Sequence, residues 1–208
     1  MLKKVAKYLR ATRTWGIHFR RTTPDPGLPT CPTPFLSSVS DSPAFPVLPS
    51  GPVLTCFLDA AHANDLRQRR STTGFAFLLA GGCVAYKCKT QTTTATSSTE
   101  AEFYAAVSAA KYARYLRSIL ADLGFPPSSP TVLYCDNQSA IKMVNARIPT
   151  DRSRHILIQH FAIQDWKDNG DIVLAFISGI LNPSDNLTKP LGWVLHTRHC
   201  RRLMGHYG

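Results

Sequence analysis

Acidic residues are scarce in this chain. Its 208 residues include only 13 Asp and Glu against 24 Lys and Arg, which gives a formal net charge of +11. Such a basic balance favours a polyanionic partner, because each neutralised phosphate releases condensed counterions. A membrane surface is also polyanionic, but no long basic amphipathic helix favours it. A basic, soluble surface without a specific partner is the alternative to nucleic acid.

Features of several other protein classes are absent. The six cysteines form no Cys-x-x-Cys pair, and no cluster of His and Cys has zinc-site spacing, which excludes a structural zinc module. Cys56, Cys83 and Cys135 lie within apolar runs, as reduced intracellular thiols do. No run is long enough to span a bilayer, and no apolar stretch follows the basic N-terminal residues. We therefore expect an intracellular protein that is not secreted and has no membrane partner.

Three segments differ in composition. Residues 1–20 carry apolar residues at helical spacing between lysines, which predicts a short basic helix followed by a short strand over Trp15–Phe19. Residues 21–52 are rich in proline and serine without periodicity, which predicts an extended or disordered linker. Residues 53–208 alternate between strand-like and helical patterns and predict one compact domain.

The compact segment is predicted to be α/β. Ala80-Gly81-Gly82 between two strand-like runs indicates a hairpin, Ser98 is a candidate helix cap and Gly124 a candidate helix stop. The order β-β-β-α-β-α-α-β-α favours a mixed sheet covered by helices. The expected strands are Val53–Asp59, Thr73–Leu79, Cys83–Cys88, Thr131–Cys135 and Asp171–Ser178, and the expected helices are Ser97–Leu123, Asn137–Asn145, Ser153–Lys167 and one from Pro183 onward.

Four acids occupy informative positions. Asp59 is expected to end the first buried strand, Asp136 follows the fourth, Asp185 opens the last helix, and Glu102 lies in the first turns of the long helix. If strands one and four are neighbours, Asp59 and Asp136 emerge at the same edge and repel each other unless a divalent cation compensates. Oxygen ligands suit Mg²⁺ or Mn²⁺, and two such ions can clamp the attacking and leaving oxygens of a phosphodiester.

Each acid also has a structural interpretation. Asp136 and Asp185 stand where carboxylates commonly cap or charge a helix start, and Glu102 could face solvent. Any one of them alone is more often structural. The metal hypothesis depends on all four acids in their order along the chain.

Four ordered motifs resemble the successive signatures of ribonuclease H domains in copia-type retrotransposon reverse transcriptases. In addition, residues 2–13 resemble the segment that joins polymerase to ribonuclease H in that family. The resemblance is dense over residues 53–204. The motifs are Arg70–Phe75 (RSTTGF), Ser97–Phe103 (SSTEAEF), Tyr134–Ala140 (YCDNQSA) and Leu187–Leu191 (LTKPL).

This resemblance implies the ribonuclease H-like fold, a five-stranded mixed sheet with its first three strands antiparallel. It implies that Asp59, Glu102, Asp136 and Asp185 are catalytic, metal-binding carboxylates. Glu102 is preferred to Glu100 because apolar residues follow it within the helix. The implied reaction is cleavage of the RNA strand of an RNA–DNA hybrid.

The resemblance also implies contacts and surroundings. Arg70, Ser71, Thr72 and Gln138 would lie near the hybrid, with turn formation and helix capping as the alternatives. Other Pol domains are possible partners, and a cytoplasmic virus-like particle or the nucleus is the expected location. The chain contains no Tyr/Phe-x-Asp-Asp motif, so we expect no DNA synthesis from it.

Some positions depart from the family pattern. Ala61 and His62 stand where an acid and an aromatic residue are usual, Leu157 replaces an acid, and Asn186 replaces an aliphatic residue and should weaken packing of the last helix. These departures favour a second hypothesis, an inactive ribonuclease H-fold module that at most binds nucleic acid. A third, a resolvase or integrase core of the same fold, is disfavoured by the SSTEAE and LTKPL signatures.

Overall fold

The computed structural model describes residues 16–19, 53–65, 67–146 and 154–205, with the side chains of residues 154–156 left out. The helix predicted within residues 1–15 and the linker at 21–52 lie outside the described residues. Residues 16–19 are irregular, so the strand predicted over Trp15–Phe19 is wrong there. The His18 amide donates a hydrogen bond to the Met204 carbonyl (2.7 Å).

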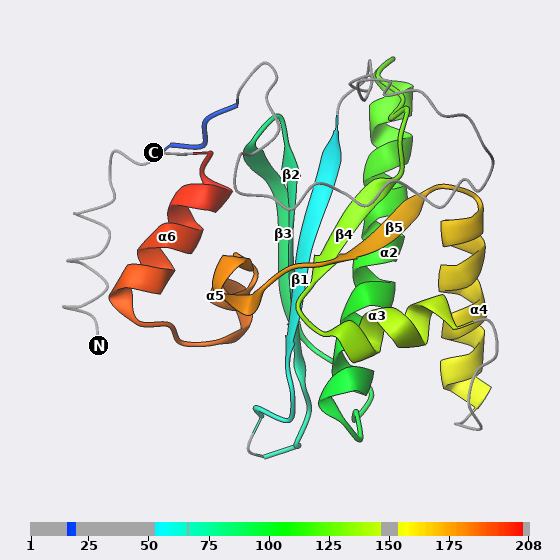
Figure 1. The fold of residues 1–208 in the computed structure, drawn as a ribbon, viewed down its shortest axis with the longest axis vertical. Helices are drawn as coiled ribbons and strands as arrows, with labels where there is room; N and C mark the ends of the chain where they lie inside the picture. Colours follow the sequence, from blue (N-terminus) through cyan, green and yellow to red (C-terminus); the bar gives the residue numbers. More distant parts are fainter. Residues whose placement is uncertain (1–15, 20–52, 66, 147–153, 206–208) are drawn as a thin grey trace, which may run out of the picture.

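A five-stranded mixed sheet forms the centre of the fold (Figure 1). Its order is β3-β2-β1-β4-β5; β1 pairs antiparallel with β2, β2 antiparallel with β3, and β4 runs parallel to both β1 and β5. This confirms the predicted five-stranded mixed sheet, and β1 and β4 are neighbours, which is the condition under which Asp59 and Asp136 were expected to meet. The strands are β1 Leu54–Ala61, β2 Thr72–Leu79, β3 Gly82–Thr90, β4 Thr131–Cys135 and β5 Ile172–Phe176.

Helices cover both faces of the sheet (Figure 1). The larger core packs α2 against the sheet with support from α3 and α4, and the smaller core lies under α5 and α6. Within the described residues, no helix is long and apolar enough to cross a membrane. The helices are α2 Ser98–Asp122, α3 Gln138–Asn145, α4 Arg154–Asp168, the single 3₁₀ turn η1 Gly179–Leu181, α5 Asp185–Thr188 and α6 Trp193–Leu203.

Several predicted boundaries are corrected by the structure. Asp59 lies inside β1 and does not end it, because the strand continues for two residues in register with β2. Ser97, and not Ser98, caps α2: its hydroxyl accepts a hydrogen bond from the Glu100 amide (3.2 Å). The single helix predicted from Pro183 is two helices, since α5 ends at Thr188 and α6 begins at Trp193.

The hairpin prediction is confirmed, and its turn shows why these residues suit it. Ala80 and Gly81 both have positive φ angles, 50° and 82°, as a two-residue turn between right-twisted strands requires. Gly124, with φ of 83°, follows α2 as predicted.

Gly74 is required by close packing between β2 and α5. It lies opposite Asp59 in the β1–β2 register, and a Cβ atom there would come within 2.5 Å of Thr188 Cγ2 and 2.9 Å of Leu187 Cβ. A side chain on Gly74 would therefore push α5, which carries Asp185, away from the sheet.

Gly74→Ala is expected to lower the free energy of unfolding by about 1–3 kcal/mol, because the added methyl group overpacks a close contact. Urea denaturation measures this. Gly16→Ala is the control, since a Cβ there meets nothing within 4 Å and should change stability by less than about 0.5 kcal/mol. Equal effects of the two changes would show that α5 does not depend on this contact.

Candidate active site

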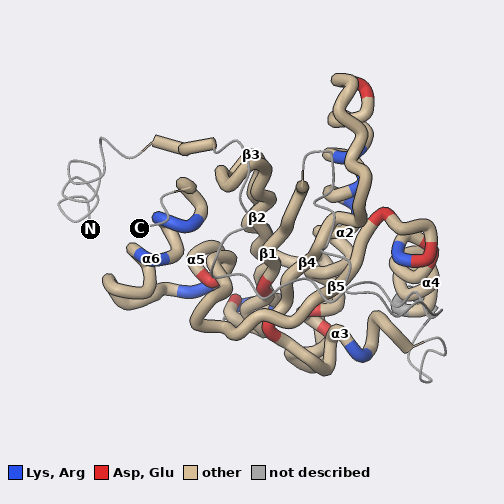
Figure 2. Tube along the Cα trace, turned by 45° about the horizontal axis from the view of Figure 1, so that its top comes forward, with Lys and Arg blue, Asp and Glu red and all other residues tan. Residues whose placement is uncertain are grey.

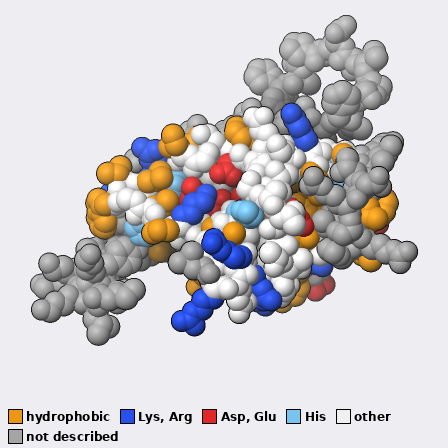
Figure 3. All heavy atoms as spheres, turned by 90° about the horizontal axis from the view of Figure 1, so that it is seen from below, with side chains coloured by type: hydrophobic (Ala, Val, Ile, Leu, Met, Phe, Trp, Pro, Cys, Tyr) orange, Lys and Arg blue, Asp and Glu red, His pale blue; other side chains and the backbone are white. Residues whose placement is uncertain are grey.

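Three aspartates converge at one edge of the sheet. Asp59 comes from β1, Asp136 directly follows β4, and Asp185 begins α5. Each offers a carboxylate oxygen, and these atoms lie within 4.8 Å of one another. In Figure 2 the acidic positions gather where β1, β4 and α5 meet, and Figure 3 shows acidic side chains at the centre of one face with basic side chains beside them.

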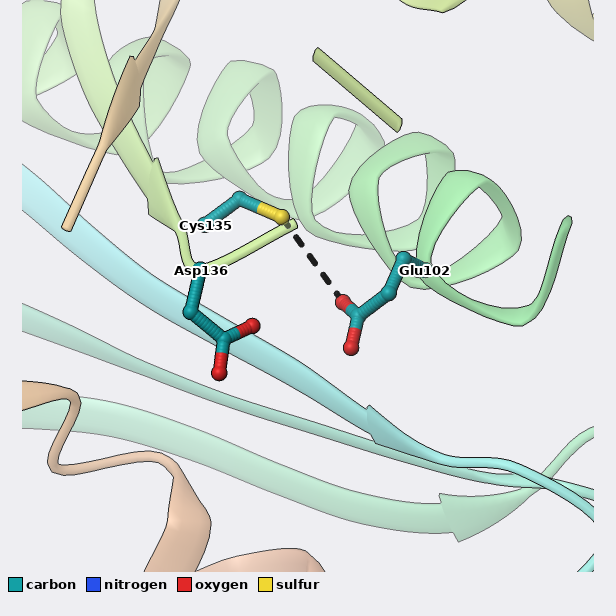
Figure 4. Close-up of side chains that lie close together, drawn as sticks. All are labelled: Glu102, Cys135 and Asp136. Carbon is teal, nitrogen blue, oxygen red and sulfur yellow. Dashed lines mark hydrogen bonds between the residues drawn. The ribbon is translucent and has the colours of Figure 1, made fainter. Parts of the chain in front are cut away.

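Glu102 joins this cluster from α2. Its carboxylate, the Asp136 carboxylate and the Cys135 thiol form a second group of ligand atoms within 4.8 Å. One oxygen, Oε1, accepts a hydrogen bond from the Ala60 amide in β1 (3.0 Å), and the Cys135 thiol donates to the other, Oε2 (3.8 Å). Figure 4 shows the Glu102 and Asp136 carboxylates extending to the same side of Cys135. The structure thus brings all four predicted carboxylates together, with Asp136 common to both groups.

The two glutamates of the SSTEAEF motif have different surroundings. The Glu100 carboxylate accepts hydrogen bonds from the Thr96 amide and hydroxyl (2.7 and 2.6 Å) and from the Tyr104 hydroxyl (2.9 Å), so it stabilises the start of α2. Glu102 faces the sheet edge and the aspartates. This geometry favours Glu102 for the site, as the sequence pattern suggested.

Asp136 does not cap α3. The residue after it, Asn137, caps that helix, because its side-chain oxygen accepts from the Ala140 amide (3.0 Å). Gly179 lies so close that a Cβ atom there would be 3.2 Å from Asp136 Oδ2. The Asp136 carboxylate is therefore available for the cluster.

Buried polar groups fix α5 beside β1. The Asn182 amide group donates to the Leu58 carbonyl (2.9 Å), and its oxygen accepts from the Ser184 hydroxyl (2.6 Å). Both side chains are fully buried. Because Leu58 precedes Asp59 and Ser184 precedes Asp185, these bonds hold the two aspartates at a constant separation. Neither Asn182 nor Ser184 was identified from the sequence, where the only signal is two polar residues flanking Pro183 just before a candidate acid.

Thr188 and Lys189 complete the cluster and were also missed as site residues. The Thr188 hydroxyl donates to Asp59 Oδ2. The Lys189 ammonium donates to Asp59 Oδ1 (3.0 Å) and to Asp185 Oδ1 (3.1 Å). Both residues lie in the LTKPL motif, and the four-residue spacing of Asp185 and Lys189 on a helix was the available signal.

Burial and mutual repulsion shift the pKa values of the acids. Burial, with repulsion from Asp59 next in size, raises the pKa of Glu102 to about 9. The same two causes raise the pKa values of Asp136 and Asp185 above their usual range. Burial alone would lower the pKa of Lys189, but its contacts with Asp59 and Asp185 outweigh burial and raise it. Ionisation of Glu102, Asp136 and Asp185 is therefore unfavourable even with Lys189 beside the cluster.

The donor set fits a hard divalent cation. Asp136 lies within ligand spacing of Asp59 and Asp185 in one group and of Glu102 in the other, and the repulsion between these carboxylates is the kind that a divalent ion removes. The one sulfur in reach, Cys135, is disfavoured as a ligand because burial raises its thiol pKa well above the usual range. Asp59, Glu102, Asp136 and Asp185 are thus the residues that could hold such ions.

The residues predicted to approach nucleic acid have mixed surroundings. Ser71 is fully buried and accepts from the Ala63 amide (3.1 Å), and Thr72 donates to Asn64 (2.9 Å), so both shape the β1–β2 connection as the turn alternative expected. Arg70 is half-buried in that connection, and Gln138 is exposed at the start of α3. Of the four, Gln138 is exposed, and Arg70 and Thr72 are half-buried.

Two further side chains, His160 and Asn186, have defined polar contacts. His160 is buried and contacts the Ala146 carbonyl through Nε2 (2.8 Å), which is a structural role. Asn186 forms polar contacts between α5 and α6: its amide group donates to the His196 carbonyl (3.3 Å), and its oxygen lies 3.2 Å from His196 Nδ1. Asn186 therefore joins α5 to α6 through polar contacts, where an aliphatic residue would join them by apolar packing.

The strand order, the antiparallel first three strands and the flanking helices define a protein of the ribonuclease H-like fold, with a carboxylate cluster where β1 and β4 lie side by side. No protein-family model matches the chain.

The chain is similar to polyproteins of plant transposons. It is 36% identical over 140 residues to the retrovirus-related Pol polyprotein from transposon TNT 1-94 of Nicotiana tabacum, which covers 67% of this chain and 10% of that protein. It is 29% identical over 150 residues to the retrovirus-related Pol polyprotein from transposon RE2 of Arabidopsis thaliana. That match covers 72% of this chain and 10% of that protein. The chain therefore spans about a tenth of the length of these relatives, and it is homologous to one segment of retrovirus-related Pol polyproteins.

Other likenesses are more distant or partial. Secreted RxLR effector protein 161 of Plasmopara viticola is 34% identical over 115 residues, which covers 55% of this chain and 62% of that protein. The solved structure of LC11-RNase H1 in complex with RNA/DNA hybrid has a TM-score of 0.49 at 11% identity, over 65% of this chain and 93% of that one. RNase H1 from Halobacterium salinarum has a TM-score of 0.47 at 18% identity, with the same coverage. The fold assignment rests on the strand order and not on these scores.

Proposed function

We propose that this chain is a ribonuclease H that hydrolyses the RNA strand of RNA–DNA hybrids endonucleolytically, using two Mg²⁺ or Mn²⁺ ions, within retrotransposon reverse transcription. One observation carries the proposal. Four carboxylates, from β1, α2, the end of β4 and α5, form two groups of ligand spacing that share Asp136, in a chain that has few acids. Homology to a segment of Pol polyproteins supports it.

The chemistry assigns a task to each side chain. Bound divalent ions would activate the attacking water and stabilise the departing oxygen of the phosphodiester. Asp136, shared by both ligand groups, and Asp59, whose charge raises the pKa of each of the other three acids, would hold the ions. Glu102 and Asp185 would complete the ligand set from α2 and α5. The Ala60 amide orients Glu102 and the Thr188 hydroxyl orients Asp59, so neither carboxylate depends on the ions for its position.

The proposed partner is the hybrid itself. The net charge of +11 favours two phosphate backbones, and recognition would rest on the shape and 2′-hydroxyls of one strand and not on base sequence. Arg70 and Gln138 are the side chains that we propose to contact it. The Pol relatives are about ten times longer than the aligned segment, so other Pol domains are proposed as further partners, in a virus-like particle or the nucleus.

The experiment is a cleavage assay with the full chain. A hybrid labelled on the RNA strand is incubated with Mg²⁺ or Mn²⁺, beside RNA–RNA and DNA–DNA duplexes and a sample with chelator. We expect cutting of RNA in the hybrid alone, and complete loss of cutting with chelator. No cutting by a chain shown to be folded by circular dichroism would contradict the proposal and would favour the inactive, nucleic-acid-binding module.

A further inference from the structure

Lys189 lies where a cation would be expected. Its ammonium donates to Asp59 at 3.0 Å and to Asp185 at 3.1 Å, and so bridges two of the three aspartates that share ligand spacing. Thr188 donates to the second oxygen of Asp59. Both oxygens of this buried carboxylate are therefore in contact with side chains from the end of α5 and the residue that follows it.

The bridging contact is one that can be broken. The Lys189 side chain is 40% exposed, whereas those of Asp59 and Asp185 are 1% and 11% exposed. Lysine carries a compact charge on a flexible four-carbon stem, so the ammonium can move into water while the carboxylates stay in place. Asn182 and Ser184 hold α5 independently of Lys189.

We propose that Lys189 is a built-in competitor for a divalent cation: its ammonium bridges Asp59 and Asp185 in the metal-free chain and leaves when an ion binds there. This inference rests on the proposed function, since it concerns the same carboxylates. It assigns Lys189 a positioning role, in which it keeps two repelling acids close until the ion arrives. It also means that the strength of ion binding is set partly by the cost of releasing the lysine.

The proposal predicts the direction in which ion affinity changes when the charge of Lys189 is removed. An ion that must displace a positive charge binds more weakly than one that enters a site with a neutral side chain in the same place. Removing the charge should therefore tighten binding on the order of tenfold at a half-exposed position. A lysine that merely supports the fold would give no gain, and one that helps to hold the ion's ligands would give a loss.

The first test measures Mn²⁺ binding to the full chain by calorimetry. We expect Lys189→Gln to bind Mn²⁺ about tenfold more tightly than the parent. Lys189→Arg, which keeps the charge, should show no gain, and Lys111→Gln removes the same charge from an exposed position of α2 as a control. Equal or weaker Mn²⁺ binding by Lys189→Gln would overturn the proposal.

The second test uses the parent chain and does not depend on how the variant folds. The chain is labelled with ¹³C at the lysine ε-carbons, and the Lys189 signal is identified by its absence in Lys189→Arg. Saturation with Mg²⁺ should move this signal to the position of a solvent-exposed lysine and leave that of Lys111 unchanged. A Lys189 signal that stays in place at saturating Mg²⁺ would also overturn the proposal.

The outcomes separate this inference from the proposed function. If the parent and Lys189→Gln bind Mn²⁺ equally and the parent cuts the hybrid, only the competitor role fails. If neither binds Mn²⁺ and neither cuts, the ribonuclease proposal fails and the competitor role fails with it.

Discussion

Asp136→Asn is expected to abolish cleavage of the hybrid, with a rate lower by on the order of 10³-fold or more, while the chain stays folded. Asp136 is the residue shared by both groups of ligand atoms among the described residues. Asn supplies one neutral carbonyl oxygen in place of the two oxygens of a charged carboxylate. Both proposed ions therefore lose a charged ligand. Single-turnover cleavage with saturating Mn²⁺ measures the loss in the chemical step.

Stability should not explain that loss. Burial and repulsion from Asp59 raise the pKa of Asp136. Its charged form therefore lowers the stability of the folded chain when no ion is bound. Neutral Asn removes the repulsion and leaves the Asn137 cap of α3 untouched. Urea denaturation in chelator should therefore show Asp136→Asn to be at least as stable as the parent.

The matched control is Asp165→Asn, which removes an exposed acid of α4 outside the cluster. It should leave cleavage unchanged. If Asp136→Asn retained most of the parent rate, or if Asp165→Asn lost as much, the carboxylate cluster would not be the site of cleavage.

The sheet and the meeting of the acids were predictable because both depend on short, local patterns. The apolar run at Thr131–Cys135 ends one residue before Asp136, and the parallel pairing of β1 and β4 brings that end to Asp59. Glu102 could be preferred to Glu100 because apolar residues follow it, and the structure turns Glu102 to the sheet edge and Glu100 to Thr96.

The parts that escaped prediction depend on contacts between distant segments. Asn182 donates to the Leu58 carbonyl, 124 residues earlier, and Lys189 donates to Asp59, 130 residues earlier. No local sequence pattern predicts either hydrogen bond. The division of the last helix was readable in principle: Pro190 and Gly192 stand between α5 and α6, and both disfavour a continuous helix.

Glu102→Gln is expected to stabilise the metal-free chain at pH 8 by roughly 2–4 kcal/mol while it removes cleavage. Burial and the charge of Asp59 raise the pKa of Glu102 from its ordinary 4.5 to about 9. Between these two pH values the unfolded chain has released a proton that the folded chain retains, so the parent loses stability as pH rises through this window. Gln has no proton to lose and can still accept from the Ala60 amide.

The measurement is urea denaturation of both chains from pH 4 to pH 9, in chelator and again with Mn²⁺. Without metal, the stabilities should be nearly equal at pH 4 and diverge in favour of Glu102→Gln as pH rises. With Mn²⁺ the parent should recover most of the difference, because the ion compensates the charge that burial penalises, and the variant should gain less. A constant difference across this range would mean that Glu102 is already ionised in the metal-free fold. The pKa of Glu102 would then not be raised in the fold, and the cluster would need no cation to compensate its charge.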